Sequence, residues 1–124
     1  MTRAELLAAL AAATGPDREI DAQIALLIGV VPEGAFRPCA ALDIGTFATG
    51  DRYWTCERYT GSLDAGRSLL APGTLWAVGS MEEGPFARLV VPNAKGTYEG
   101  GYVQATAATA ELALCIAALS ARAP

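Results

Sequence analysis

Residues 74–91, TLWAVGSMEEGPFARLVV, decide the fold class of this chain. Side chains over 74–80 follow a period of two, which is typical of a β-strand. One face of that strand would carry Leu75, Ala77 and Gly79, and the other Trp76, Val78 and Ser80. EEGP at 82–85 has the composition of a turn, and 86–91 is a second apolar and β-branched run. The stretch therefore predicts an antiparallel hairpin.

A third extended run is predicted over 97–104. Gly100-Gly101 interrupts it, which indicates a bulge or the close approach of another backbone or a ligand. The segment GTYEGG at 96–101 could cover a ligand, but it lacks the G-x-x-x-x-G-K-[ST] pattern of a phosphate-binding loop. A hairpin turn with a bulge is the favoured interpretation, so we expect three antiparallel strands.

Helical patterns precede the strands. Thr2 and Glu5 have the S/T-x-x-E spacing of a capping box and predict a first helix that ends near Thr14. A second helix is predicted from Pro16 to Ile28, with Gly29 as its stop. Periodicity then fades over 30–55, where we expect a long connection with short strands at 40–44 and 53–55 at most.

Two further helices are predicted on either side of the strand region. Thr60 is the best N-cap for a third helix, which Pro72-Gly73 closes. Thr106 or Thr109 caps a last helix that ends near Arg122. Helices grouped apart from strands indicate an α+β fold, an antiparallel three- to four-stranded sheet packed with about four helices in a layered α/β/α-type sandwich.

The length of 124 residues fits a single domain, 1–124. Hydrophobic residues make up 52% of the chain and charged residues 18%, so the chain can bury a core and is not of the disordered class. The predicted core comprises Leu6, Leu10, Ile24, Leu27, Leu69, Val78, Val90, Leu112 and Ile116. We also expect self-association, most simply a dimer, because one small core leaves apolar surface exposed.

Charge and composition exclude several function classes. A net charge of -4 argues against binding to duplex nucleic acid, whose affinity comes mainly from phosphate neutralisation. The chain has no histidine, which excludes Ser-His-Asp triads, Cys-His pairs and histidine-ligated zinc. We expect neither a cofactor nor a metal, because no phosphate-binding motif and no clustered metal ligands are present.

Cysteine usage and hydropathy indicate the compartment. Cys39, Cys56 and Cys115 are far apart and odd in number, which suits a reducing cytoplasm better than a disulfide framework. The alanine-rich start carries Glu5 and closes on Gly15-Pro16, so it is interpreted as a helix and not as a signal peptide. No charge-free apolar stretch of about 18 residues occurs, so we expect no membrane span.

Three segments together resemble a known family. They are AATGPDREIDAQIA at 12–25, RYTGSLDAG at 58–66 and ATAATAELALCIAALSARA at 105–123. Their order and content resemble the phage ABA sandwich domain of small phage and prophage proteins. Gly61 and Gly66 replace the alanines usual in that family, and 30–58 does not align. The resemblance implies helices layered around a β-sheet and a bacterial host cell, and it supplies no catalytic residues.

The segment 51–67, DRYWTCERYTGSLDAGR, gathers arginines and aromatic rings beside a predicted helix start. Arginine forks and free N–H groups bind anions, and aromatic faces stack on bases, so the segment could hold a nucleotide-like ligand. The candidate ligand-binding residues are Arg52, Tyr53, Trp54, Arg58, Tyr59, Thr60, Arg67 and Trp76. The favoured alternative places Trp54 and one tyrosine in the core, with the arginines paired to Asp51, Glu57 and Asp64.

No catalytic residue is assigned. Glu82 and Glu83 are adjacent in a turn, where they diverge into solvent and cannot flank one bond. Cys115 lies on the apolar face of the last helix, and no histidine can activate its thiol.

Three hypotheses about function remain. The first is a non-enzymatic phage or prophage accessory protein that binds or sequesters a nucleotide-like host metabolite, a defence signal or a host protein. The second is a homo-oligomeric protein-interaction or structural module without a small-molecule ligand. The third, a histidine-free enzyme that uses a carboxylate or a tyrosine, is least favoured.

Overall fold

The computed structural model describes residues 1–32, 34–36, 45–50 and 52–122, and it confirms the α+β class. The helices are α1 (Arg3–Ala12), α2 (Arg18–Ile28), α3 (Leu63–Arg67) and α4 (Ala110–Ala121). The strands are β1 (Thr46–Thr49), β2 (Arg52–Thr55), β3 (Leu75–Met81), β4 (Gly84–Val90) and β5 (Tyr102–Thr106). A strand predicted at 40–44 lies outside the described residues.

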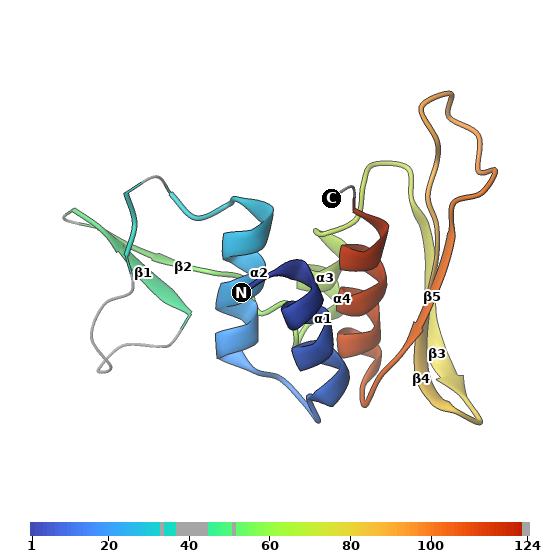
Figure 1. The fold of residues 1–124 in the computed structure, drawn as a ribbon, viewed down its shortest axis with the longest axis horizontal. Coiled ribbons are helices and arrows are strands. Elements are labelled where there is room, and N and C mark those ends of the chain that lie inside the picture. Colours follow the sequence, from blue (N-terminus) through green and yellow to red (C-terminus); the bar gives the residue numbers. More distant parts are fainter. Residues whose placement is uncertain (33, 37–44, 51, 123–124) are drawn as a thin grey trace.

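The described elements form three groups along the long axis of the molecule. The β1–β2 hairpin lies at one end, the helices occupy the middle, and the sheet β3-β4-β5 lies at the other end (Figure 1). In the described part of the chain, helices cover only one face of the three-stranded sheet. The layering is therefore helices against a sheet, with the second face of that sheet left without a helix.

The three-stranded sheet is antiparallel throughout. Met81 pairs with Gly84, so the turn is Glu82-Glu83 alone, and β4 begins at Gly84, two residues before the predicted run at 86–91. The third strand begins at Tyr102 and not at residue 97, because Asn93 organises a turn in which its backbone N–H donates to the Thr97 carbonyl at 2.7 Å. A side chain at Gly101 would collide with the backbone of Val91. The glycine pair was predicted to mark either a bulge or the close approach of another backbone or a ligand, and at Gly101 the structure shows the close approach of a backbone.

Helix ends follow local signals in most cases. The Thr2–Glu5 capping box is present, and Gly29 ends α2 with a left-handed φ of 77°. Thr109 caps α4, whereas α2 is capped by Asp17 and begins two residues later than predicted. Short-range side-chain to backbone bonds of this kind depend only on nearby residues, which is why sequence patterns find them.

The N-cap predicted for the third helix was wrong. Ser62, not Thr60, caps α3, and its hydroxyl accepts a hydrogen bond from the Ala65 N–H at 3.3 Å. Thr60 is fully buried, and its hydroxyl is engaged with α2 instead. The helix has only five residues. Gly66 lets it approach α4, since a Cβ there would lie 3.1 Å from Leu114 Cδ2.

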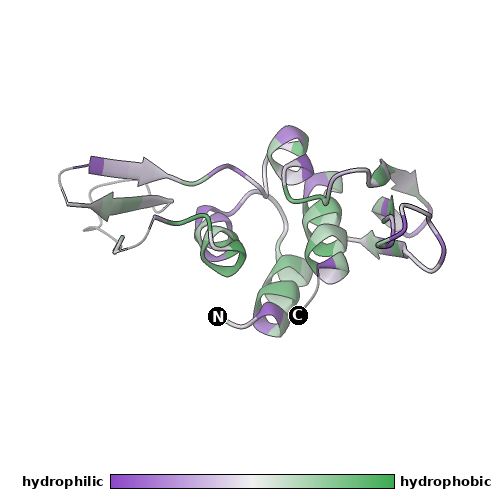
Figure 2. Cartoon of the chain, turned by 90° about the horizontal axis from the view of Figure 1, so that it is seen from above, coloured by the Kyte–Doolittle hydropathy of each residue, from purple (hydrophilic) through white to green (hydrophobic). Residues whose placement is uncertain are grey.

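The core consists of two hydrophobic clusters that share α4. One cluster joins α4 to α1, α2 and the hairpin, and the other joins α4 to the sheet. Because α4 serves both, it is apolar around most of its circumference (Figure 2). Its fully or nearly fully buried residues are Leu112, Ala113, Leu114, Cys115, Ala117, Ala118 and Leu119.

Most of the predicted core is confirmed. Full burial is found for Leu6, Leu10, Ile24, Leu69 and Leu112, and partial burial against a cluster for Val78 and Ile116. Leu27 was wrongly placed, because the buried stripe of α2 runs through Ile20 and Ile24 and leaves Leu27 38% exposed. Val90 is only partly buried, since it pairs with Leu75 and Tyr102 on the uncovered face of the sheet.

The β1–β2 hairpin occupies part of the predicted long connection. Its second strand, β2, contains the strand predicted at 53–55, but β1 was not predicted. Phe47 of β1 is 1% exposed and anchors the hairpin in the first cluster. The missed signal is Gly50-Asp51, a dipeptide common in two-residue hairpin turns, between two short runs that alternate.

Candidate functional site

The predicted ligand-binding residues are spread over four parts of the fold. Strand β2 carries Arg52, Tyr53 and Trp54; the segment before α3 carries Arg58, Tyr59 and Thr60; α3 carries Arg67 and β3 carries Trp76. Strands β2 and β3 lie on opposite sides of the helices (Figure 1). Trp76 packs in the sheet cluster, so it cannot share a ligand with Trp54.

The two aromatic residues of β2 have different roles. Trp54 is partly buried and packs in a tilted orientation on Phe47, with 5.8 Å between ring centroids and 50° between ring planes. Tyr53, its neighbour on the strand, is 69% exposed. Trp54 therefore belongs to the core, as the alternative interpretation expected, and only Tyr53 presents a free ring to solvent.

Thr60 joins a buried polar network with the start of α2. Its N–H and its hydroxyl both donate to Asp21 Oδ1, at 2.8 and 2.7 Å. The same hydroxyl accepts the Asp17 N–H at 2.8 Å. Asp21 is 1% exposed, and its other oxygen is 2.9 Å from Arg18 Nη1. A buried carboxylate is tolerated here because the Arg18 cation and two hydrogen bonds from Thr60 compensate its lost hydration.

Arg18 extends this network to the hairpin. Its guanidinium donates to the carbonyl oxygens of Glu57 and Cys56, each at 3.1 Å. Gly45 lies directly against the guanidinium, where a side chain would not fit. The network thus connects α2 to both ends of the hairpin. Because the Thr60 hydroxyl and N–H are used in this network, they are not available to a ligand.

Tyr59 and Cys115 are also committed to the interior. The Cys115 Sγ donates to the Tyr59 carbonyl at 3.1 Å. Burial, together with the Asp21 carboxylate, raises the pKa of the Cys115 thiol to about 12. Burial likewise raises the pKa of the Tyr59 phenol. At neutral pH both groups stay protonated, so neither is an activated nucleophile or base.

Arg58 lines a cavity of about 600 Å³ between the end of β2 and α3. The cavity is also lined by Glu57, Asp64, Ser62 and Ser68. Two carboxylates beside one guanidinium repel a phosphate group. They favour instead a ligand that is neutral or that carries both a positive and a negative charge. Asp51, one of the expected partners of the arginines, lies outside the described residues.

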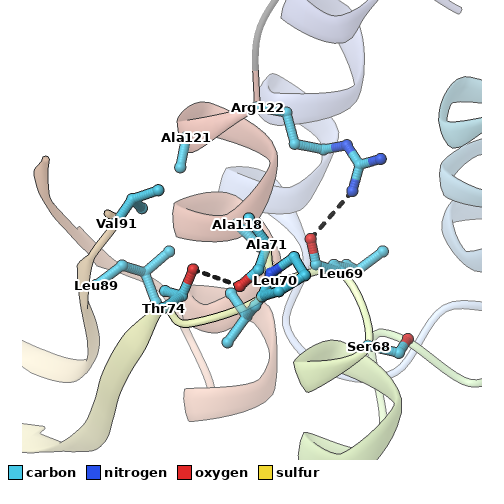
Figure 3. A pocket seen from close by; sticks show the side chains of 11 residues that line it. Ser68, Leu69, Leu70, Ala71, Thr74, Leu89, Val91, Ala118, Ala121 and Arg122 are labelled. Carbon is cyan, nitrogen blue, oxygen red and sulfur yellow. Dashed lines mark hydrogen bonds between the residues drawn. The ribbon is translucent and has the colours of Figure 1, made fainter. Parts of the chain in front are cut away.

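A second cavity, of about 550 Å³, lies beside the last turn of α4 (Figure 3). Its walls are mainly apolar and include Leu89 and Ala118. Arg122 at its rim donates to the Leu69 carbonyl at 3.0 Å, and the Thr74 hydroxyl donates to the Ala71 carbonyl at 2.7 Å. These polar contacts stabilise the 68–74 segment against α4 and do not converge on a common point in the cavity.

The uncovered face of the sheet carries a layer of its own side chains. Phe86 lies against Gly79, and the Arg88 guanidinium stacks 4.6 Å from the Phe86 ring centroid. Arg88 Nε and the Tyr102 hydroxyl both donate to Gln104 Oε1, at 3.1 and 2.6 Å. This network covers the middle of the face and leaves Leu75 and Tyr102 more than half exposed.

The edges of the sheet are a different kind of surface. Val91 N–H donates to the Gly101 carbonyl at 3.0 Å, and Ala107 N–H donates to the Pro85 carbonyl at 3.2 Å. Backbone groups of successive residues in a strand point to opposite neighbours. These two bonds therefore show that the odd-numbered residues of β4 bond to β5 and its even-numbered residues bond to β3. With the β3–β4 register, the backbone groups of Trp76, Val78 and Ser80 must point away from the sheet.

No hydrogen bond to those outward backbone groups occurs within the described part of the chain. All seven residues of β3 are uncharged, and none is proline. Natural edge strands usually carry a charge, a proline or a bulge that blocks pairing with another chain. Within the described part of the molecule, the β3 edge has none of these, so its backbone is open to pairing with another strand.

Comparisons of the chain with family models, with curated proteins and with solved structures find no match. The resemblance to the phage ABA sandwich domain is thus untested and stays a prediction. None of the helices within 1–32 and 52–122 is both long enough and apolar enough to cross a membrane. In the same described residues, no three cysteine, aspartate or glutamate side chains are grouped as metal ligands would be.

Sequence reasoning missed the two features that the structure makes most prominent. In the sequence, Arg18 and Asp21 are only two opposite charges three residues apart on a predicted helix. Ion pairs on the surface of a helix have the same spacing, so the sequence does not show that this pair is buried. The β3 edge was visible as seven uncharged residues at 75–81, but a sequence does not reveal which strands of a sheet lie at its edge.

Proposed function

We propose that the protein is a non-enzymatic interaction module that associates with copies of itself. The observation that carries this proposal is the sheet, which has helices on one face and an uncharged strand of seven residues at its edge. Unpaired N–H and C=O groups on such an edge bind a further strand readily. Self-association supplies that strand without any other component.

The geometry gives less support to a nucleotide-like ligand. Of the candidate residues, Tyr59 and Thr60 are buried in structural contacts, and Trp76 lies in another part of the fold. Arg58 shares its cavity with Glu57 and Asp64, whose charges oppose a phosphate. The phage or prophage setting rests on the family resemblance alone.

Sedimentation velocity from about 1 µM to about 1 mM protein tests the proposal over the affinity range of weak and strong homodimers. We expect the average mass to rise with concentration from that of the 12.8 kDa chain towards twice that value. A mass that stays at 12.8 kDa over the whole range would refute self-association. Heavier, open-ended species would refute a closed dimer.

A further inference from the structure

We propose that two copies of the chain join through the free edges of β3, in an antiparallel register centred on Val78, to form one continuous sheet. This inference rests on the proposed function, because it names the surface through which the copies associate. An antiparallel strand pair has two-fold symmetry, so one edge can pair with its own copy in a closed dimer. The partner is therefore a second copy of this chain.

Strand β3 is better suited to this contact than β5, the other edge. It is seven residues long and β5 is five. Helix α4 packs mainly over β4 and β5 and less over β3, which leaves Trp76 and Val78 only partly buried beside the open edge. A second copy at this edge would bury part of both side chains in addition to pairing the backbone.

The outward backbone groups determine the register. Centring the pair on Val78 places Trp76 opposite Ser80 of the partner subunit and Val78 opposite itself. All three outward residues are then paired in both copies, with about six intermolecular hydrogen bonds. A register centred on Ala77 would instead need the Thr74 N–H, which already donates to the Ala71 carbonyl at 3.1 Å.

Charge and size agree with that register. Two chains of net charge -4 repel each other, yet the contacting strands carry no charge. The antiparallel arrangement also places the Glu82-Glu83 turns of the two copies at opposite ends of the shared strand pair, so these carboxylates do not face each other. Trp76 would stand beside a small serine side chain, which leaves room for its ring.

Proline substitution tests the contact, because the N–H of an outward-facing edge residue makes no bond within its own sheet. Val78→Pro should weaken dimerisation by about 30-fold or more, since both copies lose a hydrogen bond at the two-fold axis. Thr106→Pro, at an outward-facing position of β5, is the matched control and should leave the dimer unchanged. Circular dichroism at low concentration checks that each variant is folded.

Amide hydrogen exchange in the unmodified chain provides a second test that needs no variant. At high concentration the amides of Trp76, Val78 and Ser80 should exchange at least about tenfold more slowly than at low concentration. The outward amides of β5 should exchange at the same rate in both. The inference is overturned by a dimer in which only β5 amides gain protection, or by a folded Val78→Pro variant that dimerises normally. A chain that is monomeric throughout overturns both this inference and the proposed function.

Discussion

Thr60→Val separates a structural role for Thr60 from a ligand-binding one. Valine has nearly the same shape as threonine but cannot donate to Asp21 or accept from Asp17. A hydrogen bond to a charged group contributes about 1.5–3 kcal/mol and a neutral one about 0.5–1.5 kcal/mol. The methyl group that replaces the hydroxyl is buried, and its burial offsets about 0.8 kcal/mol of this loss. The expected net loss in the free energy of unfolding is about 1–4 kcal/mol.

Urea unfolding at a fixed protein concentration measures this loss. With a slope of about 1.5–2 kcal/mol per molar urea, the midpoint should fall by about 0.5–2.5 M. Fixing the concentration matters because self-association would itself shift the midpoint. Thr106→Val, at an exposed strand position, is the control and should change the stability by less than about 0.5 kcal/mol.

A loss below about 0.5 kcal/mol for Thr60→Val would show that the polar network does not stabilise the junction between α2 and the hairpin. A double-mutant cycle with Asp21→Asn adds a second check. The two substitutions share one hydrogen bond, so their effects should fall short of additivity by about 0.5–3 kcal/mol. Simple additivity would contradict the direct contact.

Further predictions concern the core, the pH dependence and ligands. Leu112→Ala, at a fully buried position, should cost about 2–5 kcal/mol in a denaturant melt, whereas Leu26→Ala, 45% exposed, should cost well under half as much. Stability should fall from about pH 9 to about pH 12, with a slope of up to about 1.4 kcal/mol per pH unit, because the Cys115 thiol of the unfolded chain releases a proton that the folded chain retains. Cys115→Ala should flatten this slope, and an unchanged slope would assign the effect to other groups. Calorimetry with millimolar mononucleotides should show no heat; binding that Arg58→Ala weakens about tenfold would instead restore the nucleotide hypothesis.

The elements that were predicted correctly depend on short-range signals. Thr2, Gly29 and Thr109 act on backbone groups within a few residues, so their patterns identify the ends of helices. The β3–β4 hairpin is equally local, because its period and its turn lie in one stretch of sequence. These signals were sufficient for the α+β class and for the order of most elements.

The predictions that failed depend on contacts between distant parts of the chain. Threonine is a common N-cap residue, but the Thr60 hydroxyl donates to the Asp21 carboxylate, 39 residues earlier in the chain, and caps no helix. Leu27 continues the helical period of α2, yet the core reaches only the stripe through Ile24. The grouping of arginines and aromatic rings at 51–67 is close in sequence, whereas the structure divides its described residues between β2, the segment before α3 and α3.

The double role of α4 has a consequence for biosynthesis. This helix forms a wall of both hydrophobic clusters, and in the described chain it is the last element to be translated. While a ribosome is still extending the chain, α1, α2 and the sheet can form local contacts but have no shared surface to pack on. The uncharged β3 strand is complete 40 residues before α4 is, so nascent chains on neighbouring ribosomes would expose it to one another before folding finishes.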